Sequence, residues 1–87
     1  MKLSILIPVY NEEKTIIDVL QRIKKTKVDD IDYEIIVIND GSTDGTKKLL
    51  EENNILYNSL INNSRNSGKG FSVKQGLKIS TGEYIIF

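Results

Sequence analysis

Two short stretches of this sequence are almost continuously apolar. Residues 3–9 read LSILIPV and residues 33–38 read YEIIVI. Unbroken apolar runs of this length are typical of strands that are covered on both faces, as in parallel sheets. Between them, apolar residues recur at helical spacing and predict a helix over residues 12–25. The apolar positions of that helix are Ile16, Val19, Leu20 and Ile23.

The rest of the chain continues this alternation. We expect a short helix over Thr46–Glu52, a third strand over residues 55–61, a third helix over 69–80 and a fourth strand beginning at 84–87. The predicted fold class is α/β, a Rossmann-like parallel sheet with alternating helices on both faces and no hairpin. The face of the third helix that we expect to pack closely on the sheet holds Val73, Gly76, Leu77 and Ser80.

The composition excludes several kinds of chemistry. The 87 residues include no Cys and no His, which rules out disulfides, thiolate zinc sites and a Ser-His-Asp triad. Twelve Lys and Arg balance twelve Asp and Glu, so we expect no nucleic-acid partner, although a small anionic ligand is compatible with this charge. No apolar stretch approaches the roughly 18–20 residues that span a bilayer. We therefore expect a cytoplasmic protein, and for a longer form the cytoplasmic face of a membrane is a second option.

Length and the apolar end of the sequence suggest how the chain is organised. A chain of this size buries only about 60% of its unfolded surface, so residues 1–87 can form one domain at most. Because the sequence stops within an apolar strand, we expect it to be the front part of a longer protein. The fourth strand and any uncovered apolar face should then promote self-association of the fragment.

The loop after the first strand offers groups that suit a nucleoside. It lacks the glycines of a dinucleotide-binding turn. Pro8 is rigid, the ring of Tyr10 can lie against a flat base, and Asn11 and Glu12 can hydrogen-bond to a base or ribose. The alternative is a plain polar turn in which Asn11 caps the following helix and Glu12 and Glu13 favour its positive end.

The loops after the second and third strands extend this prediction. The Asp40 carboxylate can accept an N–H from a base or hydroxyls from a ribose, or it can form an Asx-type turn, whereas Asp44 is better explained as a helix cap. In the third loop, Arg65 and Lys69 lie close to Gly68 and a predicted helix start, which is a plausible neighbourhood for a diphosphate. The loop is not a Walker motif. In open parallel sheets, ligands bind past the carboxyl ends of the strands, where these loops lie.

Four segments together resemble the amino-terminal half of a family 2 glycosyltransferase. They are SILIPVYNE at 4–12, IIVINDGSTDGT at 35–46, NSGKG at 66–70 and TGEYI at 81–85. The sequence is most similar to the branch that loads sugars onto polyprenyl or dolichyl phosphates. The resemblance implies a GT-A fold, a nucleotide-diphospho-sugar donor carrying uridine or guanosine, inverting transfer, and a role in cell-envelope glycan synthesis. It also implies a polyprenyl phosphate, a polysaccharide or a glycolipid as acceptor.

The resemblance also implies roles for individual residues. Pro8 and Tyr10 would lie along the base, and Glu12 would bind the nucleoside. Asp40 would accept a hydrogen bond from the base, and the turn at Gly68 and Lys69 would lie near the base and the diphosphate. The full predicted nucleotide-sugar site is Pro8, Val9, Tyr10, Asn11, Glu12, Asp40, Arg65, Gly68 and Lys69.

The metal site of the family falls outside this sequence. The resemblance implies Mg²⁺ or Mn²⁺ for the complete enzyme, held by an Asp-x-Asp motif that follows the fourth strand, with the acceptor site and any catalytic base further on. We therefore predict no metal ligand and no assignable catalytic residue within residues 1–87, and an isolated fragment that binds donor but is inactive.

Two other functions are compatible with the same pattern of strands and helices. One is a non-catalytic nucleotide-sensing or protein-interaction module with a flavodoxin-like sheet. The other is a phosphate-accepting receiver domain in which Glu12, Glu13 and Asp40 surround magnesium. The run DGSTD at 40–44 fits the transferase better than the receiver.

Overall fold

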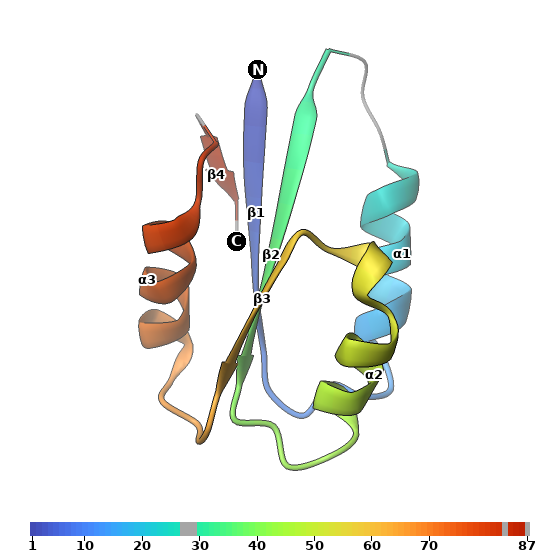
Figure 1. Cartoon of the computed structure of the whole chain (residues 1–87), viewed down its shortest axis with the longest axis vertical. Helices are drawn as coiled ribbons and strands as arrows, with labels where there is room; N and C mark the ends of the chain where they lie inside the picture. Colours follow the sequence, from blue (N-terminus) through green and yellow to red (C-terminus); the bar gives the residue numbers. More distant parts are fainter. Residues whose placement is uncertain (27–29, 83, 87) are drawn as a thin grey trace.

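The structure is a computed structural model that describes residues 1–26, 30–82 and 84–86 (Figure 1). The elements alternate as the sequence predicts, and the α/β fold class is confirmed. In chain order they are β1 (Lys2–Val9), α1 (Ile16–Lys25), β2 (Asp32–Asp40), α2 (Thr46–Glu52), the 3-10 helix η1 (Asn54–Leu56), β3 (Ser59–Asn63), α3 (Lys69–Ile79) and β4 (Tyr84–Ile86). No helix within the described ranges is long and apolar enough to cross a membrane.

The strands form one parallel sheet in the order β3-β2-β1-β4. Leu6 pairs with Ile36, Ile36 with Ser59, and Leu3 with Tyr84. This is the strand order at the start of a Rossmann sheet, whereas a flavodoxin-like sheet places β1 between β2 and β3. The flavodoxin-like alternative is therefore wrong at the level of topology.

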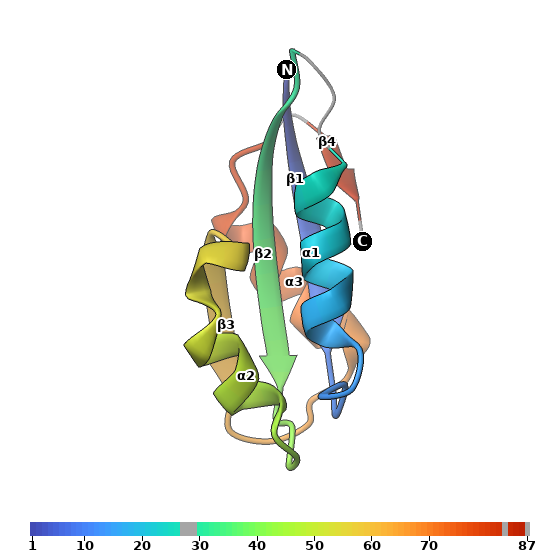
Figure 2. The same ribbon diagram turned by 90° about the vertical axis from the view of Figure 1, so that its right-hand side faces the viewer.

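The helices cover both faces of the sheet, because the chain adds β2 and β3 on one side of β1 and then returns to add β4 on the other side. Figures 1 and 2 show α1 and α2 on one face and α3 on the other. Right-handed crossovers that step from β1 to β2 to β3 place their helices on the same face. The step from β3 back across the sheet to β4 runs the opposite way, so its helix lies on the opposite face.

The sheet separates two apolar cores. The side chains of alternate residues along each strand point to opposite faces, so Ile35 and Val37 face α1 and α2 whereas Ile36 and Ile38 face α3. The first core comprises Val9, Ile16, Leu20, Ile35, Val37, Leu50 and Leu56. The smaller core under α3 depends on close approach of the helix, because a Cβ at Gly76 would lie 3.0 Å from Ile38 Cδ1.

Two predicted helices differ in detail. Helix α1 begins at Ile16 rather than at residue 12, because residues 11–15 make the contacts of the first loop. Ile16 and Leu20 are buried as predicted, but Val19 lies at the margin of the apolar stripe and is 40% exposed. In α3, Ser72 and Gly76 are the buried positions and Leu77 is 43% exposed, so the prediction that Leu77 packs on the sheet is wrong.

The third strand also begins later than predicted. Residues 54–56 form η1, whose Leu56 side chain joins the core beside α2. The chain must pass from the helical layer back to the sheet before β3 can pair, so the strand runs from Ser59 to Asn63 rather than over 55–61. The predicted fourth strand is described over residues 84–86, and residue 87 lies outside the described residues.

A polar cluster fixes the turn that leads into β4. The buried Ser4 hydroxyl donates to Glu34 Oε2 at 2.6 Å and accepts from the Gly82 N–H at 2.9 Å. The same Glu34 oxygen accepts from the Thr81 N–H at 2.9 Å. The cluster therefore connects β1, β2 and the turn after α3 at the end of the sheet where β4 begins.

Candidate functional site

The loops predicted to bind a ligand lie together at one end of the molecule. β1, β2 and β3 are parallel, so their carboxyl ends meet at the same edge of the sheet. Figure 1 shows the loops that follow them side by side at the bottom of the view. Residues 10–15, 41–45 and 64–68 thus become neighbours, as the sequence predicts for an open parallel sheet.

A cavity of about 210 Å³ opens at this edge. Residues of the predicted site line it from each of its three segments: the end of β1, the end of β2, and the start of α3. They are Pro8, Val9, Tyr10, Asp40, Gly68 and Lys69. Asn66 and Ser72 complete the lining, and Asn11, Glu12 and Arg65 do not contribute to it.

Asp40 organises the third loop. Its side chain is only 4% exposed. Oδ1 accepts hydrogen bonds from Asn63 Nδ2 at 3.0 Å and from the Ser67 N–H at 2.9 Å, while Oδ2 accepts from the Gly68 N–H at 2.8 Å. Burial by itself raises the pKa of this carboxyl, but these hydrogen bonds outweigh burial and lower it. Asp40 is therefore ionised at neutral pH and does not form the Asx-type turn considered from the sequence.

Asn11 and Glu12 join the first loop to the second loop and to the start of α2. The Asn11 N–H donates to Ser42 Oγ at 2.9 Å, and Asn11 Oδ1 accepts from the Thr43 N–H at 2.8 Å. The Glu12 N–H donates to Thr46 Oγ1 at 3.0 Å. Asn11 does not cap α1, because the residue at that position is Thr15, so this part of the alternative prediction is wrong.

The predicted cap on α2 is confirmed. Asp44 Oδ1 accepts from the Thr46 N–H at 2.9 Å, and from its hydroxyl at 2.6 Å. The polar groups of the second loop thus hydrogen-bond to the first loop and to α2. Asp40, at the end of β2, contributes the carboxylate that lines the cavity.

Arg65 enters the site through its backbone. Gly41 has φ +73°, and a Cβ there would lie 2.2 Å from the carbonyl carbon of Arg65. The second and third loops therefore touch where glycine alone fits. The Arg65 side chain is exposed and does not line the cavity.

Sequence reasoning missed Asn66 and Ser72 as lining residues. Helical spacing could have identified Ser72, because it lies one turn before Gly76 on the buried face of α3. The Ser72 hydroxyl is fully buried and makes no hydrogen bond within the described part of the chain. Asn66 carries no comparable signal, because its place depends on how the third loop folds around Asp40.

The start of α3 gives the cavity a positive side. Gly68 precedes the helix with φ +97°, and no side chain caps its first N–H groups. Lys69, the first residue of α3, is exposed, and a Cβ built on Gly68 or Gly70 would meet no atom within 4 Å apart from its own neighbouring backbone. Free helical N–H groups beside an ammonium group and open space suit an anionic group such as a phosphate.

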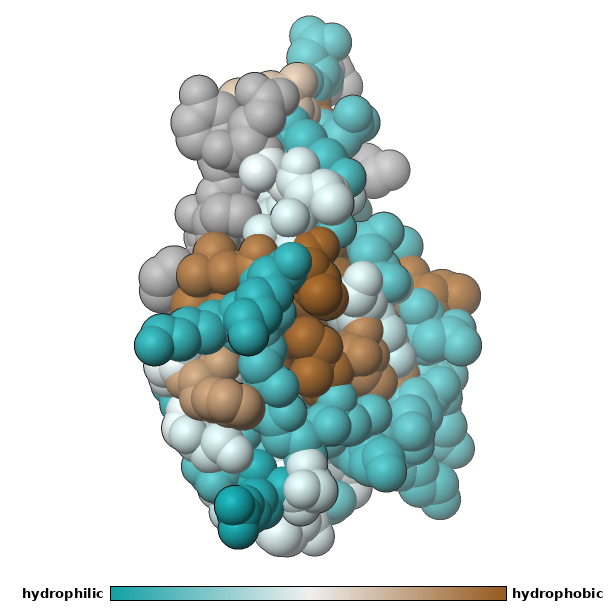
Figure 3. All heavy atoms as spheres, turned by 60° about the vertical axis from the view of Figure 1, so that its left-hand side comes forward, coloured by the Kyte–Doolittle hydropathy of each residue, from teal (hydrophilic) through white to brown (hydrophobic). Residues whose placement is uncertain are grey.

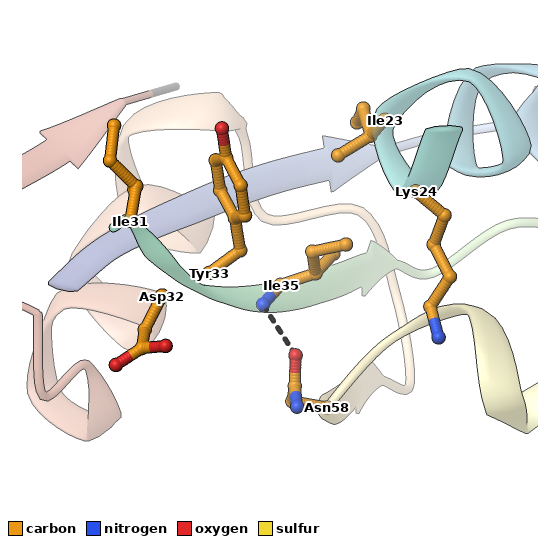
Figure 4. Close-up of a pocket in the computed structure, with 7 residues that line it drawn as sticks. All are labelled: Ile23, Lys24, Ile31, Asp32, Tyr33, Ile35 and Asn58. Atoms are coloured by element: carbon orange, nitrogen blue, oxygen red, sulfur yellow. Dashed lines mark hydrogen bonds between the residues drawn. The ribbon is translucent and has the colours of Figure 1, made fainter. Parts of the chain in front are cut away.

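A second cavity, of about 300 Å³, lies at the opposite end of the sheet (Figure 4). It is bordered by Tyr33 and Ile35 of β2 and by Ile23 and Lys24 of α1, and the Ile35 N–H donates to Asn58 Oδ1 at 2.7 Å. This end holds the amino ends of the strands, away from the crevice that ligands use in open parallel sheets. We therefore place the candidate site at the carboxyl edge.

The described residues do not fit a divalent cation. Nowhere in residues 1–26, 30–82 and 84–86 do three acidic side chains come together in a way that could hold a metal ion. Glu12, Glu13 and Asp40 in particular are not brought together, because Glu13 accepts from the Gly45 N–H while Asp40 is engaged by the third loop. The receiver-domain alternative is wrong on this point.

Comparison with known proteins agrees with this architecture. The family model described as glycosyl transferase family 2 matches residues 4–87. The chain is 39% identical over 89 residues to an undecaprenyl-phosphate 4-deoxy-4-formamido-L-arabinose transferase of Proteus mirabilis, covering 98% of this chain and 27% of that one. It is 34% identical to the poly(ribitol-phosphate) beta-N-acetylglucosaminyltransferase TarS of Staphylococcus aureus, covering all of this chain and 16% of TarS.

Solved structures extend the likeness to the fold. TarS residues 1–349 in complex with UDP-GlcNAc superimpose with a TM-score of 0.86 at 32% identity, over all of this chain and 26% of that one. The mannosyltransferase PcManGT of Pyrobaculum calidifontis, in complex with GDP-Man and Mn²⁺, gives 0.79 at 27% identity, over 95% of this chain and 25% of that one.

These chains are several times longer than the one described here, which spans about a quarter or less of each. Related enzymes thus include a UDP-sugar complex and a complex with a divalent metal. With its Rossmann-type sheet, its loop cavity and a family match over residues 4–87, the chain belongs to glycosyltransferase family 2 and has the amino-terminal part of the GT-A fold.

Proposed function

We propose that residues 1–87 form one structural unit that binds the donor nucleotide of a larger inverting glycosyltransferase. The single observation that carries this proposal is the convergence of Pro8, Tyr10, Asp40 and Lys69, from distant parts of the sequence, on one cavity at the carboxyl edge of the sheet. The donor is a nucleotide-diphospho-sugar. The acceptor is a polyprenyl phosphate or a glycan, as the names of the compared relatives suggest.

The cavity offers a distinct group for each part of the donor. The Tyr10 ring is 44% exposed beside Pro8 and can stack on a base. The buried carboxylate of Asp40 can accept an N–H from the edge of that base. Lys69 and the first N–H groups of α3 lie on the same cavity and can attract the diphosphate.

Asn11, Glu12 and Arg65 take supporting places in this proposal. Asn11 and Glu12 hold the first loop against the second, which sets the position of Tyr10. The Arg65 backbone lies against Gly41, which sets the third loop beside Asp40, and its exposed side chain is free to approach a diphosphate. We expect Asn11, Glu12 and the backbone of Arg65 to act by positioning the lining residues.

The chemistry asks mainly for positioning and for stabilisation of a leaving diphosphate. Within the described residues, Lys69 and the helix start serve that purpose, and no step through a metal ion follows from them. The PcManGT structure contains Mn²⁺, and a complete protein that used Mg²⁺ or Mn²⁺ would need ligands from residues other than these. We expect the 87-residue chain alone to bind donor without transferring sugar.

Calorimetric titration of the protein with UDP-sugar and GDP-sugar donors tests the proposal. We expect Tyr10→Ala to weaken donor binding about tenfold, because stacking on an aromatic ring contributes about 1–3 kcal/mol per base. Ile55→Ala is the matched control, because Ile55 is 77% exposed on η1, far from the cavity. A folded protein that binds neither donor would refute the proposal.

A second pair of variants separates the diphosphate from the base. Lys69→Gln removes the cation on the cavity, and Lys74→Gln removes one from the outer side of the same helix. We expect Lys69→Gln to weaken UDP binding several-fold while leaving uridine binding unchanged, and Lys74→Gln to change neither. Equal effects of both variants would mean that only the general charge of α3 matters.

A further inference from the structure

We propose that Gln75 is a positioning residue for donor binding, which fixes the Asn63 amide and, through that amide, the place of the Asp40 carboxylate on the cavity. Gln75 lies on α3 and does not line the cavity, so it acts without touching the ligand. The inference rests on the proposed function, because it concerns how one lining residue of that cavity is held in place.

Gln75 and Asn63 form a reciprocal pair of amides. Asn63, the last residue of β3, donates from Nδ2 to Gln75 Oε1 at 2.8 Å, and Gln75 Nε2 donates to Asn63 Oδ1 at 2.8 Å. The terminal torsion of an Asn side chain has broad preferences, so a single hydrogen bond would leave the amide able to tilt. Two hydrogen bonds in opposite directions fix the plane of the Asn63 amide against α3.

The orientation of the Asn63 amide matters because the same nitrogen reaches Asp40. An amide NH2 group carries two hydrogens. In Asn63 one of them points to Gln75, and the other points to Asp40 Oδ1 at 3.0 Å. An ionised carboxylate only accepts, so the nitrogen of Asn63 has to face it. Because Gln75 holds that nitrogen from the other side, a residue of α3 decides where Asp40 Oδ1 lies.

The contact with Asn63 is the one that most favours the ionised form of Asp40. Burial raises the pKa of this carboxyl, and the Asn63 hydrogen bond is the largest of the contacts that lower it. The N–H groups of Ser67 and Gly68 and the side chain of Ser72 lower the pKa as well. A residue that fixes Asn63 therefore acts on the leading contact of the carboxylate.

The amide pair requires a side chain that offers a donor and an acceptor side by side. Gln75→Leu removes both hydrogen bonds to Asn63. Gln75→Glu keeps an acceptor for Asn63 Nδ2, but it sets a carboxylate oxygen against Asn63 Oδ1 and adds a negative charge near Asp40. Gln21 is exposed on α1, so the same two substitutions at Gln21 are the matched controls.

Calorimetric titration with UDP, GDP and inorganic pyrophosphate separates the placement of Asp40 from a general effect on α3. The probe is whichever of the two nucleotides binds the unmodified protein more tightly. We expect both Gln75 variants to weaken its binding about tenfold, which is the effect of about one hydrogen bond. Pyrophosphate binding should not change, because Lys69 and the start of α3 keep their place. The Gln21 variants should change neither.

Two results of this titration would overturn the inference and leave the proposed function intact. Unchanged nucleotide affinity in both Gln75 variants would show that the amide pair does not affect the site. Equal weakening of nucleotide and pyrophosphate would show that Gln75 places the helix and not Asp40. If neither nucleotide binds the unmodified protein, the proposed function fails and this inference fails with it.

Carbon NMR of the Asp40 side chain tests the same link without a ligand. We expect Gln75→Leu to raise the pKa of the Asp40 carboxyl toward the ordinary value of an aspartate, because the hydrogen bond from Asn63 becomes looser. The other titratable side chains that line the cavity, Tyr10 and Lys69, are the same in the variant. Gln21→Leu should leave the pKa of Asp40 unchanged. An Asp40 pKa that is the same in Gln75→Leu and in the unmodified protein would overturn the inference.

Discussion

Single side chains at this site stabilise the loops around them, and their position in the sequence does not reveal this role. The sequence offers Asp40 as a ligand for a base. In the structure its carboxylate holds the third loop in place by accepting hydrogen bonds from Asn63, Ser67 and Gly68. The same carboxylate also lines the cavity. Removing it should therefore affect both the stability of the fold and the binding of nucleotide, and a binding test alone would confuse the two.

The ionisation of Asp40 gives a prediction about pH. Its pKa is lower in the folded than in the unfolded chain, so its carboxylate stabilises the fold above its ordinary pKa of about 3.9, and this stabilisation is lost as the pH falls below that value. Asp40→Asn should lower the free energy of unfolding at pH 7 by about 1–3 kcal/mol and should flatten its dependence on pH between about 5 and 3.

Urea unfolding at a series of pH values measures this effect. Asp18→Asn is the matched control, because Asp18 is exposed and pairs with Arg22 on the surface of α1 at 3.1 Å. We expect the control to change stability by less than about 1 kcal/mol. If both variants had the same pH dependence as the unmodified protein, the hydrogen bonds to Asp40 would not stabilise the fold.

The placement of β4 beside β1 depends on a few close contacts between elements. The turn that leads into β4 is held by Ser4 and Glu34, and Gly82 fits there because a Cβ would lie 2.4 Å from Ser4 Oγ and 2.7 Å from Ser4 N. Within the described residues β4 pairs with β1 over three positions, so this turn is important for holding the fourth strand in register.

Two glycine substitutions test this dependence. Gly82→Ala should destabilise the protein by about 2 kcal/mol or more, because the new methyl group meets the backbone of β1. Gly70→Ala is the control, since it lies in the first turn of α3 with open space around it, and alanine should stabilise the helix by up to about 1 kcal/mol. Thermal unfolding of both, with hydrogen exchange of the β4 amides, would check these signs. Equal stability of the two variants would contradict the predicted contact.

The whole molecule exposes apolar side chains on the side of α3. Figure 3 shows this side, where brown apolar surface lies among teal polar side chains. Phe71, Leu77 and Ile79 are 50%, 43% and 43% exposed. Exposed apolar surface of this kind promotes association, so the self-association expected from the sequence remains a prediction.

Sedimentation velocity over a range of concentrations measures that association. We expect the weight-average mass of the 87-residue chain to rise with concentration, and Leu77→Lys to reduce the rise. Ile55→Lys, at a more exposed site on η1, should have little effect. A chain that remains monomeric at all concentrations would show that the exposed apolar side chains of α3 do not cause self-association.

The sequence by itself determined the class of fold and predicted the edge of the sheet at which the candidate cavity lies. Hydrophobic periodicity is a local property, so the apolar runs at 3–9 and 33–38 identify the strands, and the polar loops after them identify the edge of the sheet that carries the candidate cavity. The capping of α2 by Asp44 was predictable for the same reason, because the cap and its helix are neighbours in sequence.

Only the tertiary structure decided the strand order and the orientation of the loop residues. The same alternation of strands and helices fits a Rossmann or a flavodoxin-like sheet, and pairing between distant strands chooses between them. Asn11 contacts the second loop and the Glu12 N–H donates to Thr46 at the start of α2, whereas Tyr10 and Asp40 line the cavity. The hydrogen bonds of Asn11, Glu12 and Asp40 that decide this join residues more than twenty positions apart. Such contacts form between loops that the sheet brings together, and local sequence carries no signal for them.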